Sequence, residues 1–153
     1  MLYCKQESVE YGGGKIMAGI AELITTGSDG TLSFGNFDLS SKQKRSDYEF
    51  EGDLYKVKTF KEITKLERNG LFVYESVPGT VVRGMKTTDT EVSFQVEGWE
   101  DSSITLELEP GTEYDVTIAG TNIGKMKTNL GGKLVLSVEM DSGSVYEIKV
   151  VKN

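Results

Sequence analysis

The side chains best suited to chemistry are the carboxylates that flank the only tryptophan. Glu97, Glu100 and Asp101 lie within two residues of Trp99. A pair of carboxylates can hydrolyse a glycosidic bond, and an indole beside carboxylates offers a sugar a stacking face and hydrogen-bond acceptors. A solvated turn around a partly buried ring gives the same pattern. We therefore predict a candidate ligand loop and assign it no catalytic residue; its members are Glu97, Trp99, Glu100 and Asp101.

Most other catalytic and metal-binding constellations lack their components. The chain contains no histidine and one cysteine, Cys4. A serine or cysteine nucleophile has no imidazole base, a zinc site has no set of Cys and His ligands, and no disulfide can form within one chain. Gly131-Gly132-Lys133 is not followed by the Ser or Thr of a phosphate-binding loop. We expect no cofactor, no metal and no enzymatic activity.

Composition indicates which partners the protein avoids. Acidic residues outnumber basic ones by 24 to 17, which gives a formal net charge of -7. This sign is unfavourable for binding nucleic acid or anionic lipid. No apolar run approaches the roughly 18 residues of a membrane span, and the N-terminal sequence lacks the basic and apolar segments of a secretion signal. We expect a cytoplasmic protein whose partners include neither nucleic acid nor membrane.

Short alternating segments separated by turn residues run through most of the chain. Tyr114, Val116 and Ile118 alternate with polar residues after the turn at Pro110-Gly111. Similar segments recur about every ten residues, with turns such as Ser28-Asp29-Gly30 and Pro78-Gly79 between them. This spacing is typical of antiparallel sandwiches. We predict an all-β protein, an antiparallel β-sandwich with an N-terminal β-hairpin layer.

The segment from 59 to 68 allows two interpretations. Phe60, Ile63 and Leu66 recur every three positions, which suits a short helix capped by Asn69-Gly70. Asn-Gly is also the strongest two-residue hairpin signal, and the segment 71–77 after it has the composition of a strand. We favour the hairpin because the neighbouring segments are β and a helix of ten residues is marginal.

The chain divides into three predicted parts. Residues 1–16 are a leader or a disordered tail, because the strand pattern begins only at Ile20. Gly12-Gly13-Gly14 before Met17 is what an in-frame ribosome-binding site would encode, so translation starts at Met1 or at Met17. Residues 17–80 form an N-terminal β lobe, and residues 81–153 form a C-terminal β-sandwich lobe.

The N-terminal lobe holds more aromatic side chains than a small hairpin layer can bury alone. These rings pack on the C-terminal lobe, or part of them meets another subunit. Nearby lysines could then meet the more acidic C-terminal half of a neighbouring copy in a head-to-tail contact. The candidate interaction surface comprises Tyr48, Tyr55, Phe60, Phe72, Tyr74, Lys56, Lys58 and Lys61.

Two resemblances follow from these segments. Leu108, Pro110-Gly111-Thr112, Tyr114 and Val116 are similar to the E to F corner of fibronectin type III and related immunoglobulin-like domains. That resemblance implies a sandwich of that kind, in which the tyrosine hydroxyl bonds the backbone of the corner. Trp99 lies too close to Tyr114 to be the early core tryptophan of that family, and more strands follow Ile118 than the family has there.

A longer resemblance covers Met17 to the end of the chain. Residues 52–67, 69–70, 72–80 and 124–134 resemble a group of small clostridial proteins that carry the label endosialidase. The label implies cleavage of sialic acid, which sialidases perform with three arginines on the substrate carboxylate and a tyrosine nucleophile. The three arginines here are Arg45, Arg68 and Arg83. Arg45 is in a basic connection and Arg68 is beside a turn, and both positions are typical of solvated charges.

Together these observations favour a bacterial structural or assembly protein without enzymatic activity, built from β lobes that self-associate or dock on another protein. A carbohydrate-binding module is the first alternative, with carbohydrate as the partner. A sialidase-type glycosidase, as the label implies, is the second.

Overall fold

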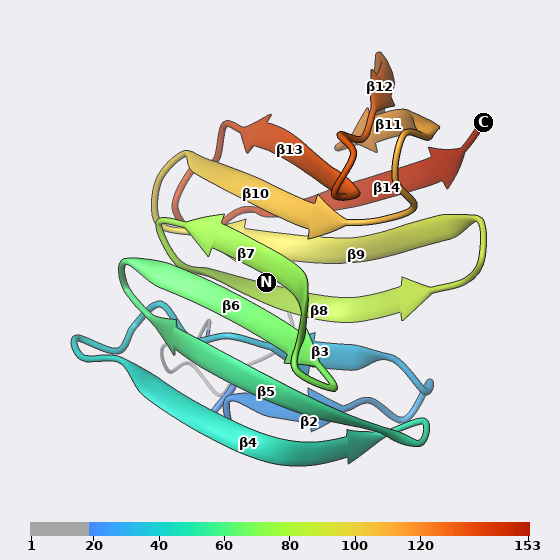
Figure 1. The fold of residues 1–153 in the computed structure, drawn as a ribbon. Helices are drawn as coiled ribbons and strands as arrows, with labels where there is room; N and C mark the ends of the chain where they lie inside the picture. The colour runs from blue at the N-terminus through green and yellow to red at the C-terminus, as the bar shows by residue number, and fades with distance from the viewer. Residues whose placement is uncertain (1–18) are drawn as a thin grey trace.

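The computed structural model describes residues 19–153, which form two antiparallel sheets (Figure 1). The six-stranded sheet has the order β13-β10-β7-β6-β5-β4, and the seven-stranded sheet has the order β12-β11-β14-β9-β8-β3-β2. The strands are β2 (Ile24–Thr26), β3 (Leu32–Phe34), β4 (Gln43–Phe50), β5 (Asp53–Phe60), β6 (Ile63–Arg68), β7 (Leu71–Val77), β8 (Thr80–Thr87), β9 (Glu91–Gly98), β10 (Ser102–Glu107), β11 (Glu113–Ile118), β12 (Thr121–Lys127), β13 (Lys133–Val138) and β14 (Val145–Lys152).

The predicted all-β sandwich is confirmed. Within residues 19–153 every regular element is a strand, so the alternative helix at 59–68 does not form. Residues 59–60 are the last two of β5, and residues 63–68 form β6. β6 pairs with β7, and the turn at Asn69-Gly70 connects them. Asn69 and Gly70 have φ angles of 52° and 80°. Positive φ at both turn positions is the geometry that Asn-Gly favours in hairpins, so local turn chemistry decided the structure here.

The segments predicted as two lobes share both sheets. The predicted boundary at residue 80 lies at the start of β8. The six-stranded sheet combines β4 to β7 from before this boundary with β10 and β13 from after it. In Figure 1, the orange β10 and β13 extend the green layer of β4–β7. The chain from 19 to 153 therefore folds around one core, and the predicted tail at 1–16 lies outside the described residues.

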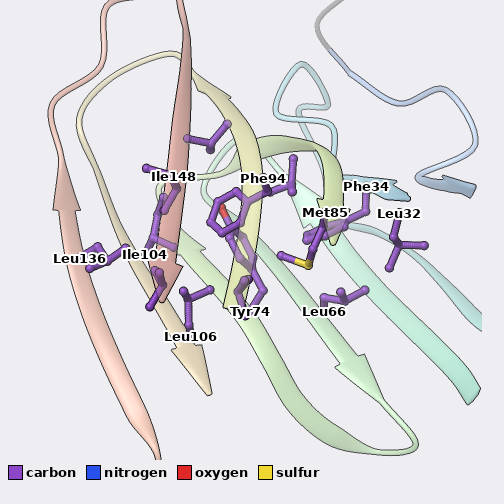
Figure 2. Close-up of a cluster of buried hydrophobic side chains, with 14 of the residues drawn as sticks. Leu32, Phe34, Leu66, Tyr74, Met85, Phe94, Ile104, Leu106, Leu136 and Ile148 are labelled. Carbon is purple, nitrogen blue, oxygen red and sulfur yellow. The ribbon is translucent and has the colours of Figure 1, made fainter. Parts of the chain in front are cut away.

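The core is built from the inward positions of both sheets. Buried and less buried residues alternate along β9, β10 and β13, as expected for strands with one covered face. Tyr74 lies at the centre of this core and is fully buried (Figure 2). Its ring contacts Phe34 and Phe94 edge-on, with centroid distances of 5.2 Å and 5.8 Å. Aromatic pairs in this geometry add stability beyond their buried area.

A network of buried hydroxyl groups joins the two sheets beside Tyr74. Thr80, the first residue of β8, has its Oγ1 2.7 Å from both the Tyr74 hydroxyl and Ser76 Oγ on β7. Thr64 Oγ1 on β6 donates to the Thr80 carbonyl at 2.8 Å and lies 2.8 Å from Thr59 Oγ1. All five residues are buried. Each hydroxyl therefore has a partner, as buried polar groups require.

The chain crosses from one sheet to the other directly before this network. Gly79 lies between β7 and β8, and its N–H donates to the Lys61 carbonyl at 2.9 Å. A Cβ at this position would lie 2.1 Å from the Phe60 carbonyl oxygen. Only glycine fits such a close backbone approach, so the Pro78-Gly79 turn that the sequence showed is required for the crossing.

Replacing Thr80 with valine should destabilise the protein. The change keeps the shape of the side chain but leaves the Tyr74 and Ser76 hydroxyls without this partner, and a stranded buried hydroxyl costs about 1–3 kcal/mol. Urea unfolding should show a loss of at least about 1 kcal/mol. Thr105→Val, on the outer face of β10, is the matched control and should change stability by less than about 0.5 kcal/mol. Equal stability of the two variants would contradict the structural role of the network.

Stability should also fall in alkali because of Tyr74. Burial raises the pKa of its hydroxyl well above the ordinary value of 10.0, although hydrogen bonds from Thr80 and Ser76 act in the other direction. A raised pKa in the folded state gives stability that is fully present below pH 10 and is lost as pH rises further. The wild type should lose about 1.4 kcal/mol per pH unit more than Tyr74→Phe above pH 10. Parallel stability curves for the two proteins would disprove this assignment.

Candidate binding surfaces

A cleft opens where the two sheets separate at one end of the sandwich. It has a volume of about 580 Å³. One wall comes from the β4–β5 and β6–β7 turns and the end of β10, and the other comes mainly from the β8–β9 hairpin. Tyr55 and Tyr114 line it with 8% and 5% of their surfaces exposed. The site has no signature in the sequence, because its residues come from turns that are distant in the chain.

Tyr55 is a buried phenol of the cleft. The Phe50 ring contacts it edge-on at a centroid distance of 5.8 Å. Burial raises the pKa of the Tyr55 hydroxyl above its ordinary value, and a hydrogen bond with Arg68 partly offsets this rise. A tyrosine nucleophile would need a lowered pKa. Near neutral pH the Tyr55 hydroxyl therefore stays protonated and can donate a hydrogen bond.

Carboxylates outnumber cations around the cleft. Glu107 forms an ion pair with Lys133, and Glu109 forms one with Lys152 at 2.7 Å. The Lys152 ammonium holds the pKa of Glu109 below its ordinary value. The remaining lining carboxylates have no ion pair within the described chain, and the basic residues that line the cleft are Arg68 and Lys86. These unpaired carboxylates belong to Glu51, Asp53, Asp89 and Glu91.

The predicted ligand loop lies at the other end of the sandwich. Trp99 follows β9, whose first residue borders the cleft, and a strand of this length spans about 25 Å. The Trp99 indole N–H donates to the Lys61 carbonyl at 3.0 Å. The Lys61 ammonium lies 4.6 Å from the indole ring centroid. These contacts tie the β9–β10 loop to the β5–β6 turn and occupy the groups that a sugar would use.

The acids of this loop have different surroundings. Glu97 accepts a hydrogen bond from Arg83 at 3.0 Å. Asp101 Oδ1 accepts the N–H of Met140 at 2.9 Å, and Glu100 is exposed. The structure therefore brings Trp99 and Asp101 into structural contacts and does not gather the three carboxylates around one point.

The residues of the predicted interaction surface are distributed over several environments. Tyr74 is in the core, Tyr55 lines the cleft, and the Tyr48 hydroxyl lies 2.7 Å from Thr26 Oγ1. Phe60 and Phe72 are partly buried and have lysine ammonium groups over their rings. Lys42 lies over Phe60, while Lys65 and Lys133 lie over Phe72 at 6.0 Å and 4.7 Å from its centroid. Within residues 19–153 the aromatic members of the candidate interaction surface are thus buried or partly buried.

The predicted lysines lie on or beside the outer face of the six-stranded sheet. Lys56 and Lys58 occupy positions on β5 that alternate with buried residues, and Lys61 is in the following turn. Lys58 pairs in register with Lys44 on one side and Lys65 on the other. The outer face therefore carries a row of like charges across three strands.

The three arginines make separate contacts. Arg45 Nη1 donates to the Glu22 carbonyl at 3.3 Å, and its guanidinium lies over the Tyr48 ring. Arg68 borders the cleft, and Arg83 pairs with Glu97. A sialidase-type site needs three arginines on one carboxylate, and this arrangement does not bring them to one point.

Within residues 19–153, each sheet has two edge strands, and three of these four edges are protected. β2 has only three residues. β4 is rich in charged side chains and has a register shift between Arg45 and Tyr48. β12 has Lys125 and Lys127, and the β11–β12 pairing also contains a register shift. Short length, charge and bulges are the usual means of preventing strands from pairing between chains.

The fourth edge, β13, is regular and mostly apolar. It pairs with β10 without a register shift over six residues. The Leu108 N–H donates to the Gly132 carbonyl. In an antiparallel pair every second residue bonds the neighbouring strand, so the backbone groups of the even-numbered residues of β13 face β10. Those of the odd-numbered residues face outward. The backbone groups of Lys133 face outward and are bonded by Asn129. The Lys133 N–H donates to Asn129 Oδ1, and the Asn129 N–H donates to the Lys133 carbonyl. The next outward backbone groups, on Val135 and Ser137, have no partner within residues 19–153.

One local expectation of the immunoglobulin-like resemblance is met. The Tyr114 hydroxyl accepts a hydrogen bond from the Glu109 N–H at 3.1 Å. This bond joins the start of β11 to the preceding corner, as a tyrosine corner does. The family resemblance itself stays a prediction.

No helix in the described part of the chain is long and apolar enough to cross a membrane. Among residues 19–153, no group of three or more Asp, Glu, Cys or His side chains is placed to hold a metal ion. Comparison with known proteins adds no assignment, because no family model, curated protein or solved structure matches this chain.

Proposed function

We propose that this protein is a nonenzymatic assembly module that pairs with a second copy of itself through the β13 edge. The observation that carries this proposal is the set of outward N–H and C=O groups of Val135 and Ser137 on β13, which have no partner within residues 19–153. The other edge strands, β2, β4 and β12, are protected against pairing. An exposed regular edge is a template for another strand.

The geometry of β13 suits pairing with its own copy. Antiparallel pairing about a two-fold axis at Leu136 places Val135 of one copy opposite Ser137 of the other. All four N–H and all four C=O groups of these residues then face the contact, and the two residue pairs form four hydrogen bonds. Leu134, Leu136 and Val138 stay buried inside their own sandwiches. The two six-stranded sheets become one continuous sheet.

The expected contact is weak. Each hydrogen bond contributes about 0.5–1.5 kcal/mol. Val135 is 51% exposed, so burying it in both copies adds a small hydrophobic contribution. Association also costs translational and rotational freedom. These opposing contributions largely cancel, so association should be visible only in concentrated protein.

Light-scattering mass across a hundredfold concentration range tests the contact. The mass of the full chain should rise above 16.8 kDa as concentration increases. Ser137→Pro removes an outward N–H that β10 does not use, and proline is tolerated on an edge strand in that position. This variant should keep its fold by circular dichroism and stay at the mass of one chain.

Lys127→Pro is the matched control, because the Thr128 N–H donates to the Thr112 carbonyl and the N–H of Lys127 therefore faces away from β11. It should associate like the wild type. All samples contain reductant so that Cys4 cannot crosslink two chains. A constant single-chain mass up to millimolar concentration would reject self-association, and association of Ser137→Pro equal to the wild type would reject the β13 edge as its site.

A further inference from the structure

We propose that the cleft between the sheets is a saccharide-binding site that selects sugars without an acidic group. This inference is independent of the β13 edge, because none of the outward groups of Val135 and Ser137 lines the cleft. It places carbohydrate binding away from the loop at Trp99, where the sequence pattern predicted it.

The walls of the cleft combine apolar surface with fixed hydroxyl groups. Phe50 and Tyr55 contribute from the six-stranded sheet, and Tyr114 contributes from the seven-stranded sheet. Aromatic rings contact the apolar C–H face of a sugar, while phenol groups hydrogen-bond its hydroxyls. The volume of about 580 Å³ lies within the range of small-molecule sites, roughly 300–1,000 Å³.

Polar groups of the cleft are held in place by contacts of their own. Asp53 Oδ1 accepts a hydrogen bond from Asn69 Nδ2 at 2.9 Å, which leaves its other oxygen for a ligand. Asn69 Oδ1 in turn accepts the Leu54 N–H at 2.9 Å. The Arg68 guanidinium lies close enough to the Tyr55 hydroxyl to lower its pKa. Side chains that are oriented before binding lose less entropy when a ligand arrives.

Charge decides which sugars fit. Within residues 19–153, the carboxylates of Glu51, Asp53, Asp89 and Glu91 border the cleft without ion-pair partners, against the guanidinium of Arg68 and the ammonium of Lys86. A ligand carboxylate would meet this negative field, and like charges brought close together are unfavourable. Sugar hydroxyls can instead donate to the carboxylates. The cleft therefore favours neutral or amino sugars over sialic acid, the opposite of what the endosialidase resemblance implies.

The test is a set of NMR titrations of the ¹⁵N-labelled full chain with defined sugars. N,N′-diacetylchitobiose, lactose, maltose and cellobiose serve as neutral probes, and N-acetylneuraminic acid serves as the acidic one. At least one neutral disaccharide should shift the amide signals of Tyr55, Arg68 and the β8–β9 turn. N-acetylneuraminic acid should leave those signals unchanged at the same concentration.

Variants separate the cleft from the loop at Trp99. Tyr55→Phe removes one hydroxyl and Asp53→Asn removes one charge. Each variant should bind the disaccharide at least about tenfold more weakly than the wild type, which corresponds to about 1.4 kcal/mol. Trp99→Phe, at the other end of the sandwich, should bind like the wild type. Three results would overturn the proposal: no shift with any neutral probe at 10 mM, equal or tighter binding of N-acetylneuraminic acid, or shifts confined to residues around Trp99.

Discussion

The buried hydroxyl network at Thr80 is the constraint on which the rest of the structure depends. The chain leaves the six-stranded sheet at β7 and enters the seven-stranded sheet at β8 within a few residues. Hydrophobic packing alone does not fix the relative position of two sheets, because it is not directional. The bonds that Thr80 makes with Tyr74, Ser76 and Thr64 are directional. They fix the position of the two layers, and the cleft forms where these layers separate.

Much of the local structure could be predicted because its causes are local. Alternation of apolar residues gave the strands, and the positive φ angles that Asn69-Gly70 allows gave the β6–β7 hairpin. Sheet membership could not be predicted in this way, because strands in either sheet have the same alternation. β10 joins β7 while β11 joins β14, although both come from the same half of the chain. The division into lobes followed sequence order and could not anticipate this exchange.

The candidate sites were harder to predict for the same reason. Trp99 and its acids form a conspicuous pattern in sequence, but the contacts of Trp99 with Lys61 are long-range and turn the ring into a structural link. The cleft has no sequence pattern, since Asp53, Arg68 and Asp89 come from three separate turns. The net charge of the chain also did not predict where charges of one sign gather on the surface. A chain with a charge of -7 places Lys44, Lys58 and Lys65 side by side on one face.

That row of lysines is the reason why the proposed assembly uses an edge and not a face. Like charges directly opposite one another on a sheet are unfavourable, and the contacts of Lys65 with the Glu67 carboxylate and the Phe72 ring offset part of this cost. Stacking two such faces would bring the rows together and increase the repulsion. Pairing through β13 keeps the rows apart, because β7 and β10 lie between β13 and the lysine-bearing strands β4 to β6. The charge pattern thus disfavours face-to-face contact while leaving the β13 edge accessible.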